Sequence, residues 1–124
     1  MLPKTHRLVS RGDFKGVFDA RHTARSGPLT LLYSRTDRKY IRFGFVVSGA
    51  VSKNAVVRNR LRRQLHEIIR FYLPSLSGGY DCVLRTYPDI VGISYKDMKK
   101  HIEIILKKSA IMNDRSKHSK LEID

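Results

Sequence analysis

Five arginines lie between positions 55 and 70, in the segment AVVRNRLRRQLHEIIR. With Lys53 included, six cations share this stretch with one acid, Glu67, so helical ion pairs can neutralise very few of them. Guanidinium groups stay charged and offer a planar set of donors that matches phosphate oxygens. We therefore interpret the segment as a surface for a polyanion, and the alternative is an ordinary solvated helix face.

Apolar residues recur in the same segment with the period of an α-helix. At about 100° per residue they fall within an arc of about 80°, which predicts a stripe packed on a core. The stripe consists of Val57, Leu61, Leu65, Ile68 and Tyr72. The other side of the wheel carries Asn59, Arg62, Arg63, His66 and Arg70, and Arg58 and Arg60 flank the stripe. The charged side chains should therefore face outward.

No constellation of catalytic or metal-binding residues is evident in the sequence. The 11 acidic residues are scattered, and the five histidines lack metal-binding spacings such as His-Glu-x-x-His. His66 is expected to be an ordinary exposed residue of the basic face rather than a general base. The single cysteine, Cys82, excludes an internal disulfide and is expected in the core. We expect no catalytic residue and no metal site.

Charge and length narrow the class of protein. The chain has 124 residues, which suits one domain, and its 25 lysines and arginines give a formal net charge of +14. Nucleic acid is the partner that such charge favours. No apolar run is long enough to span a membrane, and the N-terminus lacks a secretory pattern, so a cytoplasmic location is expected. We predict one nucleic-acid-binding domain over residues 1–112, which the resemblance described below specifies as RNA-binding, and a disordered tail over residues 113–124.

Hydrophobic periodicity and capping residues predict the order α-β-β-α-β-α, an α+β fold. The first helix should span residues 12–22, begun by Ser10 with Asp13. Residues 28–35 and 40–48 should form a hairpin, and residues 80–87 another strand. The last helix should lie within residues 94–110, with its core stripe on Met98, Ile102, Ile105 and Leu106.

Three segments in this order, RGDFKGVF, RFGFVVS and VVRNRLRRQLHE, resemble the protein subunit of bacterial ribonuclease P. The resemblance extends from about residue 7 to residue 109. It implies a small two-layer α+β sandwich of order α-β-β-(β)-α-β-α. The mixed sheet would include a short edge strand near Ala24 to Ser26, and a left-handed crossover would run through the arginine-rich helix. The general handedness rule alone favours the opposite sense.

The resemblance also implies a function. In that family the RNA subunit, with bound Mg²⁺, removes the 5′ leader of precursor tRNA, and the protein assists binding. The implied partners are the catalytic RNA and precursor tRNA, with no membrane and no obligate protein partner. The implied RNA-binding residues are Lys53, Arg58, Asn59, Arg60, Arg62, Arg63 and Arg11, and the implied leader-binding aromatics are Phe14, Phe18 and Tyr33.

Some residues leave room for other interpretations. The spacing of Phe14 and Phe18 alone favours ordinary core packing over leader binding. Gly49 and Ala50 stand where the family commonly has lysines, and His66 stands where relatives often have arginine. A ribosomal-type RNA-binding protein would share the size and basicity of this chain. A helix-turn-helix regulator is disfavoured, because strands flank the arginine-rich helix.

Overall fold

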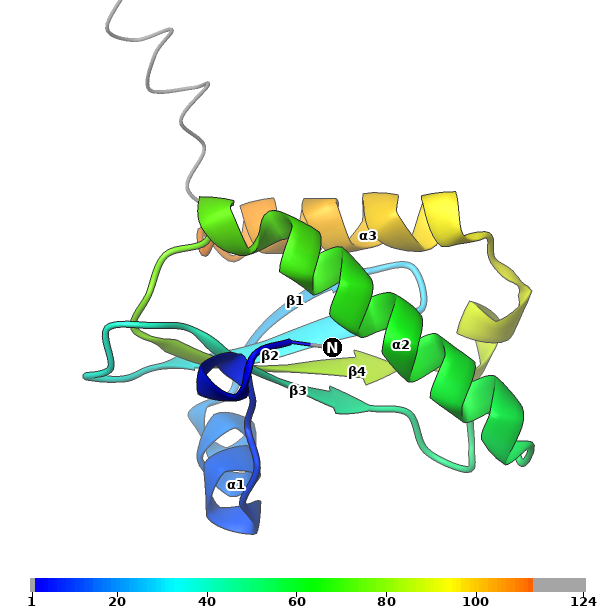
Figure 1. Ribbon diagram of the computed structural model, residues 1–124, viewed down its shortest axis with the longest axis horizontal. Coiled ribbons are helices and arrows are strands. Elements are labelled where there is room, and N and C mark those ends of the chain that lie inside the picture. Colours follow the sequence, from blue (N-terminus) through cyan, green and yellow to red (C-terminus); the bar gives the residue numbers. More distant parts are fainter. Residues whose placement is uncertain (1, 113–124) are drawn as a thin grey trace, which may run out of the picture.

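Residues 2–112 are described by the computed structural model of this chain. They form one four-stranded sheet and three α-helices, which confirms the α+β class. Figure 1 shows α2 and α3 together on one face of the sheet and α1 on the other. The predicted disorder of residues 113–124 lies outside the described residues, and the domain boundary at residue 112 stays a prediction.

Helix α1, Arg11–Ala20, begins at the predicted cap. Ser10 Oγ accepts a hydrogen bond from the backbone N–H of Asp13 at 3.1 Å, and the Asp13 carboxylate accepts one from the N–H of Ser10 at 3.4 Å. This reciprocal pair satisfies two of the free donors at the start of the helix. The helix ends at Arg21, whose φ of 59° is left-handed.

The two longer helices also begin at side-chain caps. Helix α2, Ala55–Tyr72, starts after Asn54, whose Oδ1 accepts from the N–H of Val56 at 2.9 Å. Helix α3, Tyr95–Lys108, starts after Ser94, which caps it through the N–H of Asp97. The short 3₁₀ helices of the described part are Lys4–His6, Leu73–Ser75 and Pro88–Gly92.

The sheet has the strand order β1-β2-β4-β3, with β3 parallel to β4 and the other pairs antiparallel. Its strands are β1 His22–Ser26, β2 Leu29–Arg35, β3 Arg42–Val46 and β4 Tyr80–Thr86. The edge strand expected near Ala24 to Ser26 is β1. The connection from β3 to its parallel neighbour β4 runs through α2, as the resemblance implies, and the left-handed sense of this crossover stays a prediction.

The predicted hairpin between residues 28–35 and 40–48 is wrong, because β4 lies between β2 and β3. Strand β4 takes the centre since Cys82, Val83 and Leu84 are fully buried, so both of its faces are covered. The observed hairpin joins β1 to β2 through a turn at Gly27, whose φ of 55° suits glycine.

The main hydrophobic core lies between the sheet and the helices α2 and α3, where both predicted helix stripes are buried except for Val57, which is half-buried at the start of α2. Among its fully buried side chains are Phe43, Leu61, Leu65, Ile68, Leu84, Met98 and Ile102. Cys82 belongs to this core, as predicted, and burial raises the pKa of its thiol. A smaller cluster of Leu8, Val17 and Val83 holds α1 against the opposite face. The position of α1 thus depends on far less apolar burial.

Candidate nucleic-acid interface

The outer face of α2 carries the predicted cations. Arg60, Arg63 and Arg70 are exposed, as are Asn59 on the helix and Lys53 just before it. Within the described residues none of these three arginines has an ion-pair partner. The face therefore offers guanidinium donors that an external phosphate can use.

Arg58 and Arg62 differ from the other arginines because their donors are partly used within the chain. Arg58 donates to the backbone carbonyl of Ser52 at 2.8 Å. Arg62 donates to the carbonyl of Val47 at 3.0 Å and to Asn59 Oδ1 at 3.1 Å. These contacts brace the loop between β3 and α2, in which Gly49 and Ala50 are exposed. Both arginines thus have a structural role beside any role in binding.

His66 lies inside the protein, so its predicted exposed position is wrong. Only 8% of the residue is accessible, and its ring packs on Phe45 with centroids 4.3 Å apart. Its Nδ1 accepts a hydrogen bond from the backbone N–H of Leu2 at 3.3 Å. The helical wheel placed His66 among polar residues, but the N-terminal segment covers that part of α2. Burial lowers the pKa of His66, and the positive charge of Arg7 adds to the effect.

Helix α1 contributes one exposed and one half-buried aromatic ring. Phe18 remains 39% accessible, whereas Val17 beside it is fully buried. Phe14 is half-buried and lies over Gly44, where an added Cβ atom would clash with the ring. Arg11 at the start of the helix is exposed. The two phenylalanines therefore share the face of the sheet that α1 covers, and Phe18 is the freer of the two.

Tyr33 does not lie with Phe14 and Phe18, so the predicted grouping of the three aromatics is wrong. It packs against the main core on the side of α2 and α3, and its ring stacks on His22 at 5.6 Å between centroids. Its neighbour Leu32 packs with Phe14 against the small cluster instead. Successive side chains of a strand point to opposite faces, so a shift of one residue changes the face.

A row of side chains that the sequence analysis missed crosses the sheet on the α1 face. Arg25, Thr30, Arg85 and Val46 are successive partners in the strand register, and Val46 packs on the small α1 cluster. Arg25 and Arg85 are exposed. We call these four residues the basic row. Alternation with the buried residues Ala24 and Leu84 could have revealed both arginines.

Tyr87 lies beside the basic row and is flanked by its two arginines. The guanidinium carbons of Arg25 and Arg85 lie 5.0 Å and 5.9 Å from the centroid of its ring. Thr30 Oγ1 is 3.4 Å from the Tyr87 hydroxyl. An aromatic ring with two guanidinium groups is suited to stacking on unpaired bases and pairing with the phosphates between them.

A small pocket of about 170 Å³ at the edge of β3 connects the two surfaces. Phe14 and Leu8 line it from the α1 side, and Arg62 and His66 line it from α2. Arg7 adds a second guanidinium to its wall. The α1 face and the basic face of α2 therefore adjoin around this edge, with cations on both sides.

Metal ligands, acidic side chains and membrane-spanning helices are the remaining features that bear on function. Among residues 2–112, no group of three or more histidines, cysteines or acids is placed to hold a metal ion. Asp13 and Asp81 lie in ion pairs with Arg42. No helix in this part of the chain combines the length and apolar character needed to cross a membrane.

Taken together, the mixed sheet, the arginine face of α2 and the basic row define a small α+β nucleic-acid-binding protein. Comparison with known proteins narrows this class. The family model described as Ribonuclease P matches residues 2–110. The ribonuclease P protein component of Synechocystis sp. is 35% identical over 114 residues, covering 90% of this chain and 91% of that protein. The component from Chloroflexus aurantiacus is 33% identical over 113 residues, covering 90% and 82% of the two chains.

Solved structures agree with the fold. The ribonuclease P protein of Staphylococcus aureus matches with a TM-score of 0.81 at 19% identity, covering 89% of this chain and all of that one. That of Thermotoga maritima matches with a TM-score of 0.75 at 24% identity, covering 82% and 96%. The chain belongs to the ribonuclease P protein family. Its role is that of the protein subunit of an RNA-based enzyme of tRNA processing, working with the RNA of that enzyme.

Proposed function

We propose that the α1 face binds the single-stranded 5′ leader of precursor tRNA. The observation that carries this proposal is the basic row with Tyr87, on the same face of the sheet as the exposed ring of Phe18. Stacking and phosphate contacts hold unpaired RNA without reading base edges, which suits a leader of variable sequence. Tyr33 has no part in this site, because it lies on the other face.

The basic face of α2 is assigned to the structured RNA of the enzyme. Arg60, Arg63 and Arg70 are exposed and without ion-pair partners in the described residues, so their charge is available to phosphates. Arg58 and Arg62 hold the loop that leads into the helix. Their remaining donors are assigned to the same structured RNA. The pocket at the edge of β3 is lined by residues of both surfaces, which supports placing the two RNA sites side by side.

In this proposal the protein binds and orients, and the RNA subunit performs the hydrolysis with Mg²⁺. The absence of a catalytic group in this chain was expected from the sequence, and it remains part of the proposal. The cytoplasm, where precursor tRNA is processed in bacteria, is the proposed location.

The replacement Phe18→Ala tests leader binding. Phe18 is 39% accessible, so its loss should change the melting temperature little, while one lost stack costs ~1 to 3 kcal/mol of binding. Affinity of the holoenzyme for precursor tRNA should therefore fall by about fivefold or more, and affinity for mature tRNA should stay the same. Equilibrium titration with both tRNAs measures the two constants.

Val17→Ala serves as the matched control, because Val17 is the adjacent residue and is fully buried. It should lower the melting temperature and leave the ratio of the two affinities unchanged in the folded fraction. Equal loss of precursor and mature tRNA binding in Phe18→Ala would rule out leader binding at this face.

A further inference from the structure

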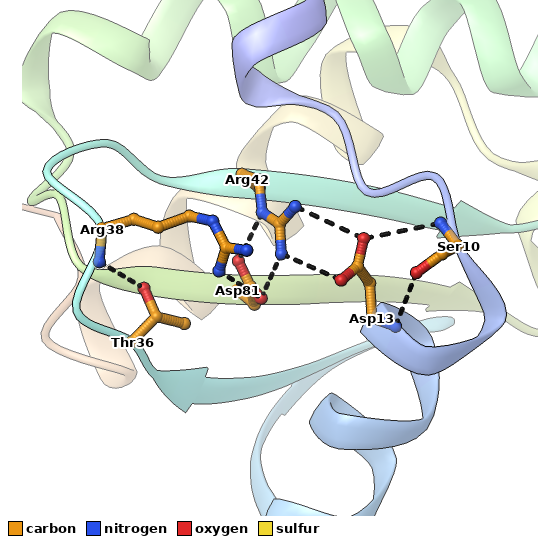
Figure 2. A network of polar contacts seen from close by, with 6 residues as sticks. All are labelled: Ser10, Asp13, Thr36, Arg38, Arg42 and Asp81. Atoms are coloured by element: carbon orange, nitrogen blue, oxygen red, sulfur yellow. Dashed lines mark hydrogen bonds and ion pairs between the residues drawn. The ribbon is translucent and has the colours of Figure 1, made fainter.

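Arg42, at the start of β3, is fixed to the neighbouring strand by a two-pronged ion pair. Its Nε donates to Asp81 Oδ1 at 2.9 Å, and its Nη2 donates to Asp81 Oδ2 at 2.7 Å (Figure 2). The side chains of Arg42 and Asp81 are only 12% and 9% accessible. Arginine stays charged at any ordinary pH, and the hydrogen bond to Asp81 raises the pKa of this guanidinium further. The sheet therefore holds a permanent positive charge at Arg42.

The remaining donors of Arg42 reach across to α1. Its Nη1 donates to Asp13 Oδ2 at 3.3 Å, and its Nη2 lies 3.3 Å from Asp13 Oδ1 (Figure 2). Burial would raise the pKa of Asp13, but hydrogen bonds from Arg42 and Ser10 outweigh it, so this pKa lies below its ordinary value. One carboxylate therefore completes the cap of α1 and ties the helix to the sheet. We call Asp13, Arg42 and Asp81 the ionic clamp.

Apart from the ionic clamp, α1 is held by a small apolar cluster. Leu8, Val17 and Val83 form this cluster, and Phe14, Leu32 and Val46 pack against it, separate from the main core on the other face. The ring of Phe14, the residue after Asp13, occupies space beside Gly44 that any larger side chain at position 44 would fill. A small rotation of the helix would therefore move Phe14 and Phe18 relative to the basic row without disturbing the main core.

We propose that the ionic clamp positions α1 for leader binding, with Asp13 and Arg42 as positioning residues that do not themselves contact RNA. The inference rests on the proposed function of the α1 face. Stacking requires rings at a defined spacing from the cations that hold the phosphates, and the clamp sets this spacing. A carboxylate beside an RNA-binding surface repels phosphates and by itself weakens RNA binding. In this proposal the charge of Asp13 is nevertheless needed, because it holds α1 in position.

Asp13→Asn tests the inference, because asparagine keeps the size of the side chain and an oxygen for the cap but loses the charge. In the holoenzyme, the affinity for precursor tRNA divided by the affinity for mature tRNA should fall by about fivefold. This is the smallest effect expected for the loss of one base stack. Affinity for the RNA subunit should not change. Amide hydrogen exchange should accelerate in α1 and stay unchanged in α3.

Asp19→Asn is the matched control. It removes the same charge from the same helix, where Asp19 pairs only with exposed Lys15 at 2.9 Å. Because it only removes a negative charge, Asp19→Asn should leave RNA affinity unchanged or improve it slightly. Asp13→Asn should instead weaken precursor tRNA binding. Asp13→Glu, which restores the carboxylate, should recover at least part of the ratio.

Three results would overturn the inference. The first is an unchanged affinity ratio in Asp13→Asn while Phe18→Ala lowers it, which would leave the proposed function intact. The second is an unchanged ratio in both variants, which would refute leader binding and the clamp together. The third is early unfolding of Asp13→Asn as a whole, which would assign the ion pairs to global stability.

Discussion

At the scale of single residues, burial and strand register decide what each side chain can do. His66 occupies a polar position on the helical wheel, yet the N-terminal segment encloses it, and Leu2 donates to its Nδ1. Leu32 and Tyr33 are neighbours in sequence but serve opposite faces of the sheet. Sequence periodicity cannot reveal either outcome, because both depend on segments that are distant along the chain. Helical spacing alone likewise favoured core packing for Phe18, whereas the ring is 39% accessible, because the small cluster beneath α1 does not cover it.

The buried imidazole of His66 should make stability depend on pH. Its pKa lies below the ordinary value of about 6.5 in the folded state, so the unfolded chain takes up a proton that the folded chain refuses. The free energy of unfolding should therefore fall as the pH decreases through about 6.5. Urea denaturation at pH 7.5 and 5.5 measures this difference, and His66→Gln should reduce it. An equal pH difference in His66→Gln and the parent would contradict this account.

At the scale of elements, α2 combines a core stripe, a brace and a charged face. Its stripe was predictable because leucine and isoleucine recur with the helical period. The order of the strands was not, since β3 pairs with β4 only after the chain has passed through α2. Local patterns favoured the shorter β2–β3 hairpin, and the burial of β4 on both faces decided the outcome. The arginines likewise look equivalent in sequence but divide into loop-bracing and free residues.

This division predicts different effects for two neighbouring arginines. Arg60→Ala should change the slope of the logarithm of RNA affinity against the logarithm of salt concentration by about 0.7 to 0.9, with stability unchanged. Arg62→Ala should also lower the free energy of unfolding by about 1 kcal/mol, because it removes the contact with Val47. Filter binding at several salt concentrations and thermal melts measure both effects. The control is Lys100→Ala, at an exposed position on α3, which should leave the salt-dependence slope unchanged. If Arg60→Ala also left the slope unchanged, Arg60 would face only solvent.

At the scale of the whole molecule, the sheet separates stability from binding. The main core lies between the sheet and the inner faces of α2 and α3, whereas the α1 face depends on a small cluster and the ionic clamp. The α1 face and the outer face of α2 meet around the edge of β3, where Arg7 and Arg62 line one pocket. The proposed function assigns one RNA segment to each side of that edge.

The affinity of the RNA subunit for precursor and mature tRNA, measured with and without this chain, tests the central claim most directly. If the α1 face binds the leader, adding the chain should tighten precursor binding by about tenfold or more and change mature tRNA binding by less than about twofold. The chain alone, free of RNA, should cleave neither substrate. Equal tightening of both tRNAs, or cleavage by the RNA-free chain, would contradict the account.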